Sequence, residues 1–324
     1  MKNKKRFLLS LGLVLGLSAL LSACGVPKET PEQVIPKFKT ALSQVVSAAL
    51  SGDARITGSD PSDAIDATLT FKSKFDYADG QKNKGSADVG LKGMITRKGK
   101  KITGDTTFSF TSIGDDFYMN LTKLETDYEE IQKIKPLLTN YMNKWLHMAP
   151  DLLPENVKKL QEQPPANRDA SRKLLAASNL FTVSKEYGIE TVNGHESYRY
   201  GISLDRNGLR EYNRQSSIID GKELSAAELD DAVEIVDAAT DVQVWIGIGD
   251  YFPYKLTALI DGNKLSSSTD LKFELALSAS DFNKSPDIAA PAKSEEFNPV
   301  ALLMGLSATQ DGAGLPDAVP PVEE

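Results

Sequence analysis

Alternation of apolar and polar side chains over residues 65–77, with Ser73 at one of the apolar positions, is the feature that most constrains the fold of this chain. The apolar set runs from Ile65 to Tyr77, and the residues between its members are mostly charged or hydroxylated. Because successive side chains of a β-strand point to opposite faces of a sheet, this period predicts one long strand with one wet face. The Ala-Asp-Gly sequence that follows supplies a turn.

Further strands are predicted along most of the chain, joined by short polar connections where they follow one another closely. Asn193-Gly194 lies between two alternating runs, which is the strongest local signal for a β-hairpin. These strands are expected at residues 87–95, 102–110, 117–124, 144–148, 181–191, 195–204, 242–249, 254–260 and 271–277. Strands in this order predict an antiparallel meander.

Helical periodicity predicts an opening amphipathic helix and several helical insertions. Thr30-Pro31-Glu32-Gln33 has the composition of a helix start, with a capping box between Thr30 and Gln33. An apolar stripe at helical spacing extends that helix to Ala49, and Gly52 ends it. Residues 128–141, 151–178 and 205–239 are also helical in pattern. The first two of these are expected to form an insertion or lid over one end of the sheet.

The N-terminus has the organisation of an export signal. A basic segment precedes an apolar run over residues 7–20, and Leu21-Ser22-Ala23-Cys24 follows. This tetrapeptide is similar to the lipobox of bacterial lipoproteins, which implies cleavage before Cys24 and attachment of diacylglycerol to its thiol. The alternatives are a plain signal peptide or an uncleaved anchor, although the run is short for a membrane span of about 20 residues.

Cysteine content and charge narrow the function classes. Cys24 is the only cysteine, so the mature chain has no other thiol and no disulfide. The formal charge of −8 includes four cationic residues of the signal, which leaves the mature chain near −12. A chain this acidic is a poor partner for nucleic acid or for an anionic membrane surface. Membrane attachment is therefore assigned to the lipid on Cys24, at the extracytoplasmic face of the cell envelope.

The domain organisation follows from these patterns. Residues 1–23 are the expected signal peptide, residues 24–29 a lipidated tether, and residues 30–285 a single domain. Residues 286–324 are rich in Pro, Ala and acidic residues, and we expect them to be mostly disordered, with one apolar island at residues 297–306.

Motifs for catalysis, for cofactors and for metals are absent from the sequence. His147 and His195 are the two histidines, and neither has a Cys or a second His nearby, so a structural or exposed role is favoured. The acidic residues between Asp230 and Asp237 are better explained as the wet face of a helix than as a cation site. We therefore expect no enzyme, no cofactor and no metal site.

Two local patterns carry a resemblance to a known group. Residues 191–200, which hold Asn193-Gly194 and lead to Leu204-Asp205, are followed by residues 242–246 leading to residues 251–256. With the export signal and the meander, these paired hairpins resemble the LolA/LolB and LppX/LprG group of lipid-handling envelope proteins. The resemblance implies an α+β fold: a strongly curved antiparallel half-barrel of about eleven strands, with helices covering its concave face over an apolar cavity.

Such a cavity would be lined by alternate apolar side chains of the strands. Its candidate lining residues are Leu69, Phe71, Phe75, Phe108, Phe110, Tyr118, Trp245 and Ile246. A filled core made of the same residues is the alternative. We expect a lipid-anchored envelope protein that binds or carries a lipid, an acyl chain or another hydrophobic ligand. The second hypothesis is a non-enzymatic interaction or sensor module resembling RseB, with a protein partner that the sequence does not identify.

Overall fold

The computed structural model describes residues 28–59, 63–78, 83–153, 165–264 and 270–297. The expected export signal and Cys24 lie outside these residues. The chain divides into two compact units, residues 1–37 and 38–324. In the first unit, the side chain of Gln33 accepts a hydrogen bond from the backbone N–H of Thr30, which is one half of the predicted capping box. Helix α2 (Pro31–Ser43) begins there and extends into the second unit.

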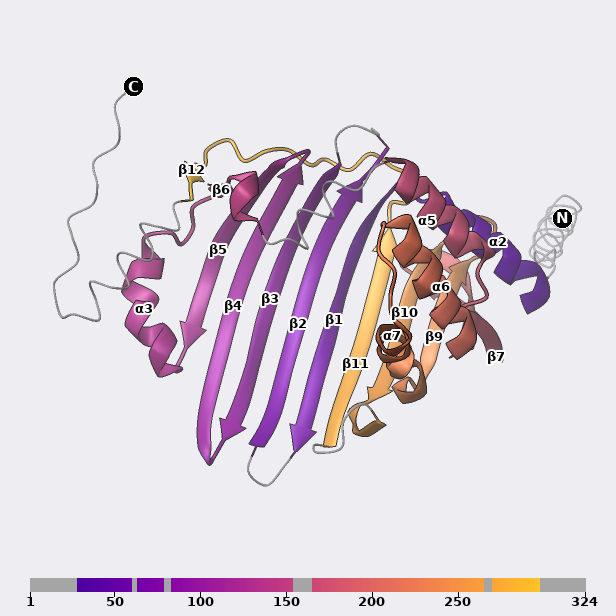
Figure 1. Cartoon of the computed structure of the whole chain (residues 1–324), viewed down its shortest axis with the longest axis horizontal. Coiled ribbons are helices and arrows are strands. Elements are labelled where there is room, and N and C mark those ends of the chain that lie inside the picture. The colour runs from indigo at the N-terminus through magenta and orange to yellow at the C-terminus, as the bar shows by residue number, and fades with distance from the viewer. Residues whose placement is uncertain (1–27, 60–62, 79–82, 154–164, 265–269, 298–324) are drawn as a thin grey trace, which may run out of the picture. The chain divides into compact units, whose positions relative to one another are not determined.

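The described strands form one sheet of twelve, in the order β12-β6-β5-β4-β3-β2-β1-β11-β10-β9-β8-β7 (Figure 1). All neighbours are antiparallel except β12 and β6. The strands are β1 (Ser47–Ser59), β2 (Asp63–Asp76), β3 (Lys84–Arg97), β4 (Lys100–Ile113), β5 (Asp116–Thr126), β6 (Leu146–Met148), β7 (Phe181–Val192), β8 (His195–Leu204), β9 (Val242–Gly247), β10 (Pro253–Asp261), β11 (Asp270–Ser280) and β12 (Glu295–Glu296). The predicted meander is confirmed.

The described helices are α2, α3 (Glu129–Thr139), α5 (Pro165–Ala177), α6 (Arg206–Ile219) and α7 (Ala226–Ala238), with short 3-10 turns at Pro150–Leu152 and Gly262–Lys264. Helices α5, α6 and α7 lie over the β9–β11 side of the sheet (Figure 1). The architecture is therefore an α+β curved half-barrel with helices on its concave face, as expected. None of the helices in the described part of the chain is long and apolar enough to span a membrane.

Local capping chemistry fixes several of these boundaries. The hydroxyl of Ser225 accepts a hydrogen bond from the N–H of Glu228, and the Glu228 carboxylate accepts one from the N–H of Ser225. This reciprocal capping box starts α7. Asn193 and Gly194 both have positive φ, 52° and 82°, as a two-residue turn of type I′ requires. The turn therefore sets the register of the β7–β8 hairpin.

Helix α2 ends at Ser43, six residues earlier than the sequence predicts, and β1 begins at Ser47. The apolar residues after Ser43 satisfy a period of two as well as a helical period. In the structure, Ala48 lies opposite Phe75 and Ala54 opposite Leu69, so they add to the face that β2 presents. Residues 47 and 48 pair with β2, and residues 49–53 pair with both β2 and β11, which gives this backbone its hydrogen bonds. The prediction of a helix through Ala49 is wrong.

Strand β7 lies at one edge of the sheet, and its pairing with β8 is interrupted twice. The register shifts between Val183 and Lys185 and again between Glu186 and Gly188. Gly188 has a φ of 102°, a conformation that favours glycine. The two irregularities bend the edge strand within five residues.

The segment after Ser285 reaches the opposite edge of the sheet at β12. Ile288 is only 8% exposed, and β12 pairs with β6. Lys144 and Glu295 form an ion pair, with 2.9 Å between Nζ and Oε1. The sequence expectation for residues 286–324 is a mostly disordered tail, yet residues 286–297 dock against the domain through one buried side chain and a short strand. Residues 298–324, with most of the predicted apolar island, lie outside the described part.

Candidate ligand-binding face

One face of the sheet, here called the apolar face, carries apolar residues or glycine at matching positions across nine strands. Each member of the central row pairs with the next through the strand register. The row consists of Tyr200, Val244, Leu256, Leu277, Gly52, Phe71, Val89, Phe108 and Leu121. The register shifts once between β9 and β10 and once between β4 and β5, but neither shift interrupts this row, so the apolar face is continuous from β8 to β5.

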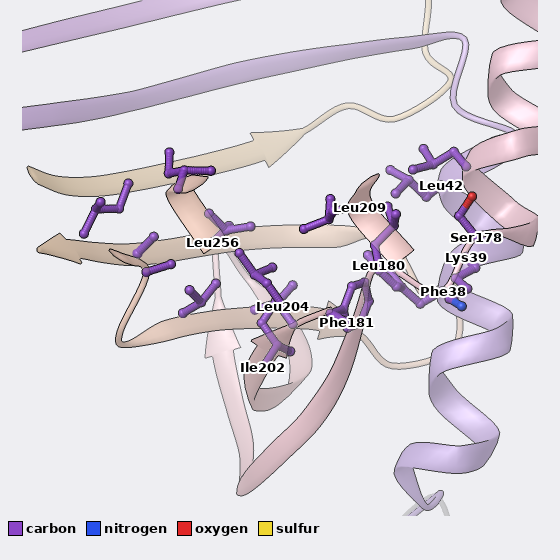
Figure 2. A pocket seen from close by; sticks show the side chains of 17 residues that line it. Phe38, Lys39, Leu42, Ser178, Leu180, Phe181, Ile202, Leu204, Leu209 and Leu256 are labelled. Atoms are coloured by element: carbon purple, nitrogen blue, oxygen red, sulfur yellow. The ribbon is translucent and has the colours of Figure 1, made fainter. Parts of the chain in front are cut away.

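Helices enclose a cavity over one half of this face, here called the covered half (Figure 2). Its volume is about 360 Å³. Strands β8, β9 and β10 form its floor, and α2, α5, α6 and α7 contribute the other walls. The lining side chains are apolar except for Lys39 and Ser178: Phe38, Leu42, Leu175, Leu180, Phe181, Ile202, Leu204, Leu209, Ile235, Ala239, Val242, Val244, Leu256, Ala258 and Ile260.

The remainder of the apolar face, over β2 to β5, is here called the open half. No described helix lies over β2, β3 or β4 (Figure 1). Leu91 and Ile95 are 48% and 47% exposed, an unusual state for large aliphatic side chains that share a face. A groove of about 460 Å³ runs along this half to α3, where Tyr128 and Ile131 line its end.

Five of the predicted lining residues, on β2 and β4, lie on the open half. They are Leu69, Phe71, Phe75, Phe108 and Phe110. The rings of Phe108 and Phe110 stack with centroids 6.0 Å apart. Ile246 is on the covered half, where it is fully buried. These six residues share the apolar face, but none of them lines the 360 Å³ cavity.

Tyr118 and Trp245 lie on the opposite face of the sheet, in contrast to the expectation. Tyr118 pairs with Thr111, whereas its neighbour Met119 pairs with Phe110 on the apolar face. Trp245 is 3% exposed and belongs to a buried cluster with Val192 and Tyr254, and it also has polar and charged partners. Its Nε1 donates to Glu190 over 3.0 Å, and the guanidinium of Arg199 lies 5.0 Å from its ring centroid. Cations stabilise an aromatic ring on a polar face, so aromatic character does not specify the interior.

The Glu190 carboxylate illustrates the charge on this opposite face. Its pKa is lowered, first by the hydrogen bond from Trp245 and also by the positive charges of Arg199 and Lys255. Lys255 Nζ lies 4.6 Å from the Trp245 ring centroid. Arg199 also donates two hydrogen bonds to Gln243. These side chains form a polar network around the buried Trp245 ring.

The cavity lining itself is the part of the site that the sequence reading missed. Ile202 and Leu204 on β8, and Leu256 and Ile260 on β10, are spaced by an even number of residues and so face the cavity together. Their strands are predicted correctly, and the alternation within them is the available signal. The prediction of lining residues instead favoured aromatic residues, and most of these lie on the open half.

Two polar residues lie at one end of the cavity (Figure 2). Lys39 Nζ donates a hydrogen bond to Asn179 Oδ1 over 3.1 Å. Ser178 Oγ donates to the carbonyl of Leu174 over 2.7 Å. Within the described residues, Lys39 forms no ion pair. The cavity therefore combines an apolar interior with one ammonium group at its rim.

The histidines and the acidic cluster have structural partners. His195 stacks on Tyr254, with ring centroids 4.0 Å apart. His147 forms hydrogen bonds with Glu296 and Asp116, over 2.8 and 3.2 Å. Asp230 forms an ion pair with Arg210 on the neighbouring helix. Across the described ranges, no group of three or more His, Cys, Asp or Glu side chains is arranged to hold a metal ion.

Comparison with known proteins gives matches among solved structures alone, since no family model and no curated protein matches the chain. LprF from Mycobacterium bovis shows 10% identity over 82% of this chain and 99% of its own, with a TM-score of 0.35. The lipoprotein LppX from Mycobacterium tuberculosis shows 14% identity over 80% and 100%, with a TM-score of 0.28. A LolA superfamily protein from Nitrosomonas europaea shows 10% identity over 80% and 96%, with a TM-score of 0.21.

The matches include LppX and a LolA superfamily protein, which are in the group that the sequence resembles. All three TM-scores are below 0.5.

Proposed function

We propose that this protein binds a hydrophobic ligand, such as a lipid or another molecule with an acyl chain, on its apolar face without catalysing a reaction. The cavity of the covered half carries this proposal, because its wall is apolar at every position except Lys39 and Ser178. Its volume is within the range of about 300–1,000 Å³ that is common for small-molecule sites.

An empty space of this kind is energetically unfavourable. Protein interiors are packed about as densely as organic crystals, and the atoms that line a void lose the contacts that a neighbour would provide. An acyl chain that enters the cavity restores those contacts and removes its own apolar surface from water, which contributes about 25 cal/mol per Å². The apolar wall gives no hydrogen-bond partners for water over most of its area.

Ligand uptake tests the proposal directly. We expect the mature chain, residues 24–324 with Cys24→Ser, to bind the uncharged fluorescent probe N-phenyl-1-naphthylamine. Ala258→Trp should reduce this binding, because residue 258 lines the cavity and a bulky side chain would occupy it. Thr257→Trp is the matched control, since residue 257 is adjacent in β10 and points to the opposite face. Absence of probe binding by the wild-type protein would count against the proposal.

We further propose that the protein is a lipoprotein, attached to the extracytoplasmic face of a membrane by diacylglycerol on Cys24. The lipobox-like tetrapeptide and the absence of any other cysteine support this assignment. Mass spectrometry of the N-terminal peptide should find an acylated Cys24, and Cys24→Ser should abolish acylation and leave either an uncleaved precursor or a released form. A wild-type N-terminus without acyl mass would refute the anchor.

The open half favours a second candidate function, an interaction or sensor module. Leu91 and Ile95 are about half exposed on one face. Exposed apolar patches of this kind are typical of surfaces that bind another protein. If this function holds, Leu91→Asp should abolish capture of a protein partner by the full-length protein and leave probe binding in the covered half unchanged. If Ala258→Trp loses probe binding but still captures the protein partner, the two halves have separate roles.

A further inference from the structure

The position of Lys39 distinguishes between ligands that the apolar wall alone would accept equally. Lys39 belongs to α2 and lines the cavity together with Ser178, which follows α5 (Figure 2). The other lining residues carry no charge. The Lys39 side chain is half-buried, so its ammonium group lies at the boundary between the apolar interior and water.

The positive charge of Lys39 has no negatively charged partner among the described residues. Its ammonium donates to the neutral amide oxygen of Asn179, and it forms no ion pair within the described part of the chain. An ammonium group has three donors, and one is used here. By contrast, Lys100 and Lys123 on the sheet, Lys222 before α7 and Lys284 after β11 each pair with a carboxylate.

Ser178 lies beside Lys39 in the cavity wall. Its hydroxyl proton is used in a hydrogen bond to the carbonyl of Leu174, and its oxygen can still accept a hydrogen bond. Among the residues that the structure describes, no carboxylate lines the cavity, so none of them would repel a negatively charged ligand there. The rim therefore attracts anions, and the interior excludes polar groups.

We infer that the ligand of this cavity is a single-chain amphiphile with an anionic head group, whose chain lies among the apolar lining and whose head group binds the ammonium of Lys39. This inference rests on the proposed function. A volume near 360 Å³, at the low end for small-molecule sites, fits one chain better than several. A carboxylate and a phosphate monoester supply the same chemistry, and charge-assisted hydrogen bonds to either are stronger than neutral ones.

Competition between amphiphiles that differ in the head group tests this inference. N-phenyl-1-naphthylamine is bound to the mature chain carrying Cys24→Ser, and laurate, methyl laurate and dodecyl phosphate compete for its site at low ionic strength. We expect laurate or dodecyl phosphate to compete about tenfold more strongly than methyl laurate. Higher affinity for dodecyl phosphate would identify a phosphate head group, and higher affinity for laurate a fatty acid.

Variants of Lys39 connect the preference to the ammonium group. Lys39→Gln should abolish the preference for the anionic amphiphiles, and Lys39→Arg should retain most of it. Lys92→Gln is the matched control, because Lys92 is an exposed lysine of β3 that does not line the cavity. The same change of charge there should leave the ratio unaltered.

The possible outcomes separate the two proposals. If the wild-type protein binds the probe and methyl laurate displaces it as well as laurate does, the head-group inference fails and the proposed function stands. A preference that persists in Lys39→Gln would also overturn the inference. If neither the wild-type protein nor any of these variants binds the uncharged probe, the proposed function itself is wrong.

Discussion

At the scale of single residues, the strand register decides what an apolar side chain contributes. Ile246 and Leu91 both belong to the apolar face, but Ile246 is fully buried in the covered half and Leu91 is about half exposed in the open half. A large aliphatic side chain of this face therefore stabilises the fold in the covered half and forms part of an exposed surface in the open half.

Truncation of these two residues should have unequal costs. We expect Ile246→Ala to lower the free energy of unfolding by about 2–5 kcal/mol, because it leaves a cavity in a packed region. Leu91→Ala should cost about 1 kcal/mol, since roughly half of its surface already meets water. Urea unfolding measures both values. Equal costs for the two variants would show that the open half is buried in solution.

A single histidine links the tail to the sheet and makes that contact dependent on pH. His147 faces Glu296 of β12, Asp116 of β5 and the ring of Tyr118. The pKa of His147 is raised from its ordinary value of 6.5, first by its hydrogen bond with Glu296 and further by Asp116, against the opposing effect of burial. The folded state therefore binds the proton more tightly than the unfolded state.

The sign of the pH effect follows from this shift. Protonated His147 contributes its full stabilisation below the unfolded pKa, and this contribution is lost as the pH rises through the higher folded pKa. Protection of the Glu295 and Phe297 amides, which donate to the backbone carbonyls of residues 145 and 147, should therefore be greater near pH 5.5 than near pH 8. Hydrogen exchange, corrected for intrinsic rates, measures this difference. His147→Gln should remove it.

At the residue scale, alternation predicted which positions of β2 and β4 share a face, whereas Tyr118 and Trp245 lie on the other face; that any of the candidate residues contacts a ligand stays a prediction. Alternation identifies which residues share a face, but an aromatic residue can lie on either face when charged partners stabilise it. Trp245 has Arg199, Lys255 and Glu190 around it, and these residues come from three different strands. These residues become neighbours of Trp245 only after the strands pair, so the sequence around Trp245 does not predict them.

At the scale of elements, α7 contributes a wall of the cavity through Ile235. Its capping box satisfies backbone groups at the start of the helix, and Leu229 and Val233 anchor its buried side. The start of the helix and the shape of the cavity are therefore connected through one rigid element.

Removal of the cap should affect both stability and binding. We expect Ser225→Ala to lower the free energy of unfolding by about 1 kcal/mol, the usual cost of a lost N-cap, and to weaken probe binding slightly by loosening the wall that carries Ile235. Calorimetry and probe titration on one preparation measure the two effects. Ser225→Asp, which retains a capping oxygen, should restore stability; failure to do so would indicate that the hydroxyl has another role.

Elements with a distinct turn or cap were predictable, and elements defined by partners were not. The Asn193-Gly194 hairpin and the Ser225 capping box are local, so the sequence contains all of their determinants. The end of α2 depends on whether the residues after it pair with other strands. Their partners are β2 and β11, and β11 is more than 200 residues away in the sequence. Likewise, β12 exists as a strand because β6 is there to pair with it.

At the scale of the whole molecule, the segment after Ser285 should contribute measurable stability. Truncation at residue 285 removes the buried Ile288 and β12, so we expect the melting temperature to fall by about 5 °C or more relative to a chain that ends at residue 297. Thermal unfolding of the two truncated proteins measures the effect of residues 286–297 alone. Equal melting temperatures would indicate that this segment adds nothing to the fold.

An open sheet, unlike a closed barrel, leaves a row of unpaired backbone donors and acceptors at its edge, and a second copy could extend the sheet there. In this protein the two irregularities of β7 interrupt that row, and Lys185 and Glu186 place opposite charges between them. A straight strand from a neighbouring molecule would meet hydrogen-bond partners out of register. We therefore expect this edge to disfavour sheet extension between copies of the protein at high concentration.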